Sequence, residues 1–242
     1  MTLEDFFACL SYGRLSNLSI GMEGQGSIAP ADQSRITHHV NETLTALYSR
    51  FSHKTDYVNV RLSADRNRYS IKTQNAVSNT VGTNLAPRYL IDSEDVPFAN
   101  DLIKIIRIST EEGEGTDRKL VDCPLNDKAQ PKSLRTISYN ELFVPDPVER
   151  KILTIEYQAK HKRLSIPVDL DEEIILAPVL ETALEAAVAS RVYGSMNGEE
   201  NTNKSIMLNN EYETMLALVD VKDLMQETMS ADHNKFIKNG WA

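Results

Sequence analysis

His38 and His39 are the residues whose type best suits metal chemistry in this sequence. Neutral imidazole is a common zinc ligand, and zinc enzymes place two such rings on one helical face at positions i and i+4. Adjacent helical residues point about 100° apart, so these two rings cannot face one ion together. We therefore predict that His38 lies on the polar face of a helix, that His39 flanks the apolar stripe containing Val40, and that neither binds a metal.

Two groups of acidic residues would suit calcium binding or paired catalytic carboxylates. The first comprises Glu111, Glu112, Glu114 and Asp117. It lacks EF-hand spacing and flanking helices, which predicts a solvated loop instead. The second comprises Asp169, Asp171, Glu172 and Glu173. Acidic residues ahead of a helix are favoured by the helix macrodipole, so we interpret this group as a helix start rather than as a catalytic pair.

Other catalytic signatures are missing from the sequence. It holds no G-x-x-x-x-G-K-[ST] and no G-x-S-x-G, and Gly21, Gly24 and Gly26 do not match G-x-G-x-x-G. Cys9 and Cys123 form no C-x-x-C pair, and we interpret them as small apolar fillers. We predict no catalytic, cofactor-binding or metal-binding residue, and hence no enzyme. An enzyme of unrecognised class, or a small-molecule binder, with a cleft between helices and sheet stays an alternative.

Helical periodicity is confined to the two ends of the chain. Thr2 and Asp5 form a capping-box pattern ahead of a first helix, whose apolar face is Leu3, Phe6, Phe7 and Leu10. A second helix begins near Pro30, with a stripe formed by Ile36, Val40, Leu44, Leu47 and Phe51. A third has an alanine-rich face formed by Leu180, Ala183, Leu184, Ala187, Val188 and Val192. The fourth is predicted over about 204–227, with a core of Ile206, Leu208, Tyr212, Met215, Leu216, Val219 and Leu224.

Between these helices the pattern is typical of strands. Val58, Val60 and Leu62 alternate with polar neighbours, and "NRYSIKT" is predicted to be the hairpin partner of that strand. Further strands are predicted at "LIKIIRIST", "KLVDCPL", "SYNELFV" and "KILTIEYQA". Several short strands joined by turns indicate an antiparallel sheet or sandwich.

Together these elements predict an α+β fold: an antiparallel bundle of about four helices, an inserted antiparallel β-sheet or sandwich domain, and an extended C-terminal arm. We expect the first part of the bundle at 1–53, the β-rich insertion at 54–170, the second part of the bundle at 171–229 and a docking arm at 230–242. The two ends of such an insertion must lie close together.

The net charge of −9 is concentrated in the last third of the chain, where residues 171–242 hold 13 acidic and five basic side chains. This distribution argues against a surface that grips phosphates. No apolar run approaches the roughly 20 residues that cross a bilayer. Glu4 and Asp5 stand where a secretion signal would carry Lys or Arg, so we expect a protein that stays in the cytoplasm.

The run "ILTIEYQAKHKRLSIPVDLDEEIILAPVLETALEAAVASRVYGSM" resembles the head-to-tail adaptor (connector) proteins of tailed phages, in particular short-tailed, podovirus-like phages. In that family a sheet strand leads into the last bundle helices in the same way. Similar segments are "RITHHVNETLTALYSRF", "YVNVRL", "LIKIIRI" and the terminal "FIKNGWA". The resemblance spans roughly residues 30–242 and lies in the order and general character of the segments rather than in one motif.

The resemblance implies a structural virion protein, assembled in the host cytoplasm, that joins capsid to tail. Its copies, commonly twelve, would form a ring beneath the portal protein and above a tail nozzle or tail-tube protein. DNA would pass through the lumen without specific binding, and no membrane would be involved. Docking on the portal would fall to Phe236, Ile237 and Trp241. Acidic residues would line the lumen and repel DNA: Glu172, Glu173, Glu181 and Glu185. A tail-tube or tail-completion ring protein is the alternative.

Overall fold

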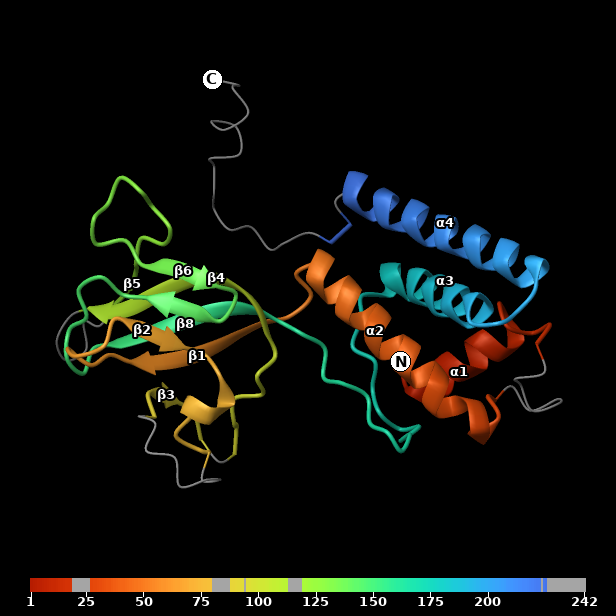
Figure 1. Ribbon diagram of the computed structural model, residues 1–242, viewed down its shortest axis with the longest axis horizontal. Helices are drawn as coiled ribbons and strands as arrows, with labels where there is room; N and C mark the ends of the chain where they lie inside the picture. Colours follow the sequence, from red (N-terminus) through yellow and green to blue (C-terminus); the bar gives the residue numbers. More distant parts are fainter. Residues whose placement is uncertain (19–26, 80–87, 94, 113–118, 223, 226–242) are drawn as a thin grey trace, which may run out of the picture. The chain divides into compact units, whose positions relative to one another are not determined.

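The protein folds into two compact units that alternate along the chain (Figure 1). The computed structural model describes residues 1–18, 27–79, 88–93, 95–112, 119–222 and 224–225. One unit combines Met1–Ser52 with the chain from Arg163 onward, and the other is His53–Lys162. Their described residues form four α-helices in the first unit and two antiparallel sheets in the second. The predicted α+β class with antiparallel sheets is therefore confirmed.

Helix α1 (Leu3–Tyr12) begins with the predicted capping box. The Asp5 N–H donates to Thr2 Oγ1 at 3.1 Å, and the Thr2 N–H donates to the Asp5 carboxylate at 3.1 Å. These bonds satisfy two of the donors that a helix start leaves without an intrahelical partner. The apolar face predicted for this helix is buried in full.

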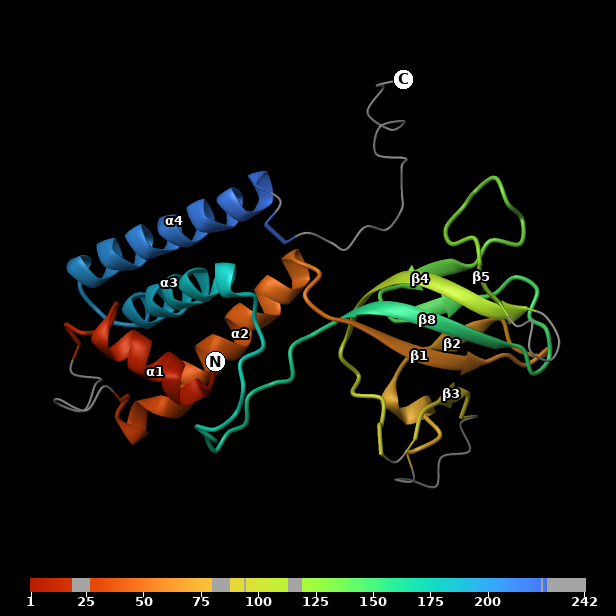
Figure 2. The same cartoon turned by 180° about the vertical axis from the view of Figure 1, so that it is seen from behind.

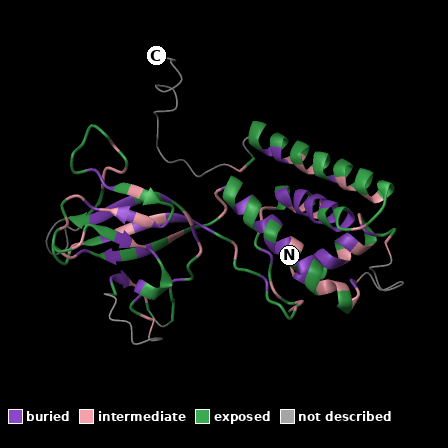
Figure 3. Cartoon of the chain, viewed as in Figure 1, coloured by how far each residue is buried: buried purple, intermediate pink, exposed green. Residues whose placement is uncertain are grey.

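Helices α2 (Pro30–Arg50) and α3 (Pro178–Gly194) each carry proline in the first turn, where its missing N–H costs nothing. The stripe predicted for α2 is buried from Ile36 to Leu47. Helix α3 lies between α4 on one side and α1 and α2 on the other, in the front and back views alike (Figure 1, Figure 2). Its alanine-rich surface is buried on nearly every side, as the colouring in Figure 3 shows. No described helix has the length and apolar character that a membrane span requires.

Helix α4 spans Glu199–Val221 and thus begins earlier than the predicted start near residue 204. The sequence "NGEENTN" reads as a break, but only its first two residues form the turn. Gly198 adopts a φ of 114°, a conformation that side chains with a Cβ rarely adopt. Glu199 and Glu200 then occupy the first helical turn, where the macrodipole favours acidic side chains.

The larger sheet has five strands in the order β3-β1-β8-β4-β5. They are β3 (Leu90–Ile91), β1 (Thr55–Arg61), β8 (Ile152–Ala159), β4 (Leu102–Glu112) and β5 (Lys119–Asp122). The strands that open and close the unit, β1 and β8, are direct antiparallel neighbours, with Thr55 opposite Gln158. The two ends of this unit therefore lie side by side, since opposed residues of such a pair are about 5 Å apart.

The smaller sheet has the order β2-β7-β6, with β2 (Arg68–Ser70), β7 (Glu141–Phe143) and β6 (Arg135–Ser138). The predicted hairpin between "NRYSIKT" and the first strand is wrong, because β2 pairs with β7 instead. Local alternation identifies a strand but carries no information about its partner. Both sheets contribute to one apolar cluster, which includes Tyr69 and Leu142 from the smaller sheet and Val60 and Ile155 from the larger.

Residues 163–177 belong to the helical unit, so the β unit ends before the expected boundary at residue 170. The Leu3 N–H donates to the Glu172 carbonyl at 2.9 Å, and the Ile174 N–H donates to the Met1 carbonyl at 2.9 Å. Glu173 forms an isolated antiparallel bridge with Thr2. The interpretation of the acidic group at 169–173 as a helix start is therefore wrong. Its backbone pairs with the N-terminus, and α3 begins only at Pro178.

Candidate functional site

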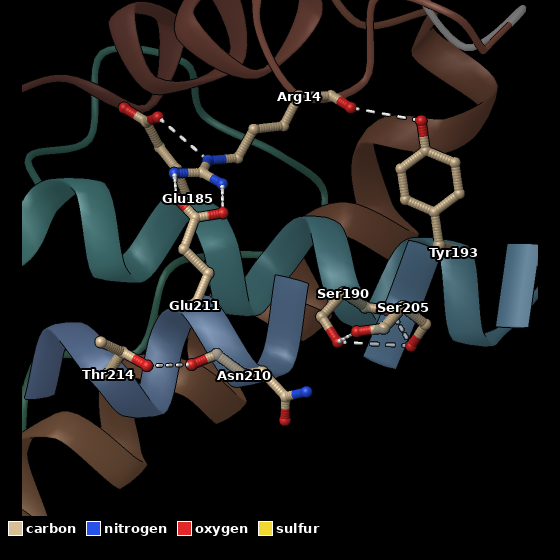
Figure 4. A network of polar contacts seen from close by, with 8 residues as sticks. All are labelled: Arg14, Glu185, Ser190, Tyr193, Ser205, Asn210, Glu211 and Thr214. Atoms are coloured by element: carbon tan, nitrogen blue, oxygen red, sulfur yellow. Dashed lines mark hydrogen bonds and ion pairs between the residues drawn. The ribbon is translucent and has the colours of Figure 1, made fainter. Parts of the chain in front are cut away.

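A polar cluster of the helical unit joins the end of α1 to α3 and α4 through one arginine, Arg14 (Figure 4). Arg14 donates two hydrogen bonds to the carboxylate of Glu211 on α4, at 2.7 and 2.9 Å. The same guanidinium lies 3.7 Å from the carboxylate of Glu185 on α3. A bidentate pair of this kind fixes both distance and orientation, because the planar guanidinium matches the carboxylate.

The backbone around Arg14 is fixed by the end of α1. The Gly13 N–H donates to the Cys9 carbonyl at 2.9 Å, and the Leu15 N–H donates to the Leu10 carbonyl at 2.9 Å. A Cβ on Gly13 would lie 2.7 Å from the Cys9 carbonyl oxygen, so only glycine permits this tight turn. On the other side, the Tyr193 hydroxyl of α3 donates to the Arg14 carbonyl at 3.2 Å. The arginine is thus placed by its own helix end and by α3.

The pKa values of the two carboxylates in this cluster are shifted in opposite directions. The hydrogen bonds from Arg14 lower the pKa of Glu211, whose side chain is partly exposed. Burial raises the pKa of Glu185, and the nearby Arg14 charge offsets only part of that effect. Hydrogen bonding to Glu211 raises the pKa of Arg14 itself. The strong partner of the arginine is therefore Glu211, while Glu185 is a half-buried carboxylate that burial disfavours in its charged form.

Helices α3 and α4 approach closely where small residues face each other. The Ser190 hydroxyl donates to the Ser205 carbonyl at 2.9 Å, and the Ser205 hydroxyl donates to the Ser190 carbonyl at 2.9 Å (Figure 4). A Cβ on Gly194 would meet Ser205 Oγ at 2.9 Å, which is closer than real Cβ contacts. Both hydroxyls donate to carbonyl oxygens rather than to a base that would activate them. This arrangement therefore fastens two helices together and does not form a nucleophile.

A second set of ion pairs fastens α2 to the other helices. Arg50, the last residue of α2, donates to Asp220 at 2.7 Å and to Glu213 at 3.4 Å, both on α4. Arg191 of α3 is bonded to Glu42 of α2. Together with Arg14, these arginines link α2 and the end of α1 to α3 and α4. These ion pairs hold the helices of this unit against one another.

The acidic residues expected along a lumen lie in different surroundings. Glu172 accepts hydrogen bonds from the Ser165 backbone and hydroxyl at 2.7 and 3.0 Å, and Glu173 is exposed. Glu181 lies in the first turn of α3 and is partly exposed, whereas Glu185 faces Arg14. The structure thus brings only Glu185 into the polar cluster. The predicted docking residues Phe236, Ile237 and Trp241 lie outside the described residues.

The histidine pair lies on α2 at the predicted positions. His38 is exposed and its Nε2 lies 3.1 Å from Glu42, one turn later. His39 is half-buried, and burial lowers the pKa of its imidazole. Among the residues that the structure describes, no three His, Cys, Asp or Glu side chains gather in a way that could hold a metal ion.

One surface was missed by sequence reasoning. Ile206 and Leu224 were assigned to the core of α4, but both are exposed, as are Met207, Leu218 and Val221. Only Leu208, Leu216 and Val219 of this helix are buried. No regular spacing in the sequence marks this surface, because apolar residues occur on both sides of α4.

No protein-family model matches this chain. No curated protein matches it either.

Proposed function

We propose that this chain is a structural virion protein, the head-to-tail adaptor that forms a ring beneath the portal and joins the capsid to the tail. The observation that supports this proposal is the discontinuous helical unit. Segments from both ends of the chain share one apolar core, while the β unit leaves and returns through the neighbouring strands β1 and β8. The adaptor-like sequence segments follow this same order: helix, strands, then the last helices.

The same proposal covers the roles of the four helices and of the C-terminal segment. The four helices would act as an antiparallel bundle, and residues 230–242 would act as an arm that docks on the portal. Phe236, Ile237 and Trp241 are large apolar side chains among polar neighbours, and such side chains are typical anchors in partner pockets. In this role the chain catalyses no reaction, and its task is to hold neighbouring proteins in register.

Charge supports the passage of DNA through such a ring. The helical unit, including its C-terminal segment, holds 19 acidic and nine basic residues, whereas the β unit holds 16 acidic and 17 basic residues. Acidic walls repel the phosphate backbone, so DNA would slide without adhering. Glu172, Glu173 and Glu181 are the lumen candidates with exposed or partly exposed side chains. Glu185 would contribute least, because its charge faces Arg14.

The test is binding of the purified chain to its portal protein, imaged by electron microscopy and measured by co-sedimentation. We expect a ring on the portal, and we expect removal of residues 230–242 to abolish binding while the far-ultraviolet circular dichroism of the helices is retained. Trp241→Ala should weaken binding at least about 10-fold, as for an interface anchor. Asn239→Ala is the matched control in the same segment and should bind normally.

If the truncated chain still bound the portal, residues 230–242 would not be the docking arm. Binding to a tail component but not to the portal would favour the second candidate, a tail-tube or tail-completion ring protein. The same architecture supports that candidate, and the partner that co-sediments distinguishes the two.

A further inference from the structure

His39 is an ionisable side chain whose two ring nitrogens are buried without a hydrogen bond. Only 17% of the side chain is exposed, and neither nitrogen has a hydrogen-bond partner among the residues that the structure describes. A neutral imidazole carries one donor and one acceptor, and burying both without partners costs free energy. An apolar side chain of similar size would avoid that cost. What an imidazole adds at this position is its capacity to take up a proton near neutral pH.

The ring lies beside the ion pair that joins α2 to α3. The Glu42 carboxylate is bonded through Oε2 to Arg191, in the last turn of α3. His39 Nδ1 lies 3.9 Å from the same oxygen, which is too far for a hydrogen bond. The other carboxylate oxygen, Oε1, lies 3.1 Å from Nε2 of His38. Both oxygens of Glu42 thus have neighbours, and a protonated His39 would compete for the oxygen that Arg191 holds.

The surroundings of the ring disfavour its charged form. Burial is the main cause that lowers the pKa of His39, and the Glu42 carboxylate opposes that shift. The positive charge of Arg191, together with His38 and Arg35 on α2, lowers the pKa further. One carboxylate therefore faces several cationic or protonatable groups, and it is already bonded to one of them.

The remaining charged groups around this cluster do not change that balance. Arg35 is paired with Asp32 at 3.0 Å, one turn earlier on α2. Tyr212 of α4 also lies in the field of Arg191, but burial raises the pKa of its hydroxyl. Tyr212 therefore stays neutral when the pH falls below 7, and the group that changes its charge at the α2–α3 contact is an imidazole.

We propose that His39 is an acid-sensitive trigger of the α2–α3 contact: when the ring takes up a proton, it competes with Arg191 for Glu42 and weakens the ion pair between the two helices. This inference does not depend on the adaptor role. At neutral pH one carboxylate balances one arginine. In acid, either Glu42 moves toward the imidazolium, or the imidazolium stays buried beside Arg191 without a partner. Both outcomes oppose the contact.

The response to acid has a defined direction and an upper limit. The pKa of His39 is lower in the folded protein than its ordinary value of 6.5, so the unfolded chain takes up the proton first as the pH falls. The unfolding equilibrium constant therefore rises as the pH falls from 6.5 toward the folded pKa, and His39 leaves it unchanged well above 6.5. For one imidazole the rise at pH 5 is at most about 30-fold.

Urea unfolding of the full chain at pH 7.5 and pH 5.0, followed by the circular dichroism of the helices, tests the response. Between these pH values the wild-type unfolding constant should rise by about 3- to 30-fold more than that of His39→Phe or His39→Gln, neither of which titrates. His38→Gln, at the exposed neighbour, is the matched control and should keep the wild-type response. An equal rise in the wild type and both His39 variants would overturn the proposal, as would a response that disappears only in His38→Gln.

A double-mutant cycle between Arg191→Met and Glu42→Gln tests which contact responds. At pH 7.5 these two side chains should be coupled by up to about 5-fold in the unfolding constant, the range for an exposed ion pair. At pH 5.0 the coupling should disappear with His39 present and persist with His39→Phe. Coupling that is absent at pH 7.5, that is equal at both pH values with His39 present, or that is lost in acid in both backgrounds would contradict the role of His39.

Discussion

At the scale of single residues, Arg14 holds two carboxylates whose roles differ. Glu211 accepts a bidentate bond from the arginine, which favours its charged form, while burial disfavours the charged form of Glu185. The two substitutions to glutamine should therefore have different consequences, although both remove one acidic group next to the same arginine.

We predict that Glu211→Gln lowers the free energy of unfolding by about 1–2 kcal/mol at pH 7, the range for a charge-assisted bond that is partly exposed. The pKa of Glu211 is lowered on folding, so its contribution is present above its ordinary value of 4.5 and is lost as the pH falls through the lower folded pKa. The difference between wild type and variant should thus shrink in acid. Urea unfolding from pH 7 down to pH values below 4.5 measures it.

Glu185→Gln is the matched comparison for that experiment. Because burial raises the pKa of Glu185, its charged form opposes folding at neutral pH, and the neutral amide removes that cost. We expect a smaller loss of stability than for Glu211→Gln, or a gain. A larger loss at Glu185 would show that its ion pair with Arg14 outweighs burial.

At the scale of elements, the contact between α3 and α4 depends on the absence of a side chain at Gly194. We predict that Gly194→Ala destabilises the protein, although alanine is ordinarily the better helix former by about 0.5–1 kcal/mol. The added Cβ would displace the Ser205 hydroxyl from the Ser190 carbonyl. In a Ser205→Ala background the obstacle is removed, and the same substitution should become neutral or stabilising. The four unfolding free energies of this cycle test the contact, and equal effects in both backgrounds would contradict it.

A second prediction at this scale concerns the contact that secures the segment after the β unit. Asn41 of α2 donates to the Leu164 carbonyl at 3.1 Å and accepts from the Leu164 N–H at 2.8 Å, both buried. We predict that Asn41→Ala lowers the free energy of unfolding by about 2–4 kcal/mol, because two buried backbone groups lose their partner. Asn209→Ala, at an exposed position of α4, should change it by less than about 0.5 kcal/mol. Chemical denaturation of both variants provides the comparison.

At the scale of the whole molecule, the chain consists of two units with separate apolar cores. The strands β1 and β8 that connect them are hydrogen-bonded neighbours, so the ends of the helical unit's two segments are already brought close together. We predict that replacing His53–Lys162 with a short glycine-serine linker leaves a folded helical unit, and that His53–Lys162 alone folds as a β protein. Circular dichroism and calorimetry of each part measure this outcome. Loss of cooperative unfolding in either part would contradict their independence.

Much of the fold was predictable because it depends on local periodicity. The apolar faces of α1 and α2, the strands β1, β4 and β8, and the α+β class all follow from spacings of two or of three to four residues. Pairing partners were not predictable in this way. "NRYSIKT" forms a strand, but its partner is β7, more than 70 residues later. Residues 169–173 carry the composition of a helix start, yet their backbone bonds go to the N-terminus.

The polar cluster was hardly predictable at all. Arg14 and Glu211 are nearly 200 residues apart, and no local pattern relates them. The side of α4 that faces α3 was only partly predictable, because apolar residues lie on both sides of this helix. Which of them is buried depends on the neighbour that the helix meets.

The sequence by itself determined which segments are helices and strands, and it placed the β unit between two helical segments, because hydrogen bonding along the backbone and burial of one face act over a few residues. Only the tertiary structure decided which strands are neighbours, which carboxylate Arg14 binds and which side of α4 stays exposed. These outcomes arise from contacts between residues far apart in the chain, whose distances are set by the packing of the whole unit.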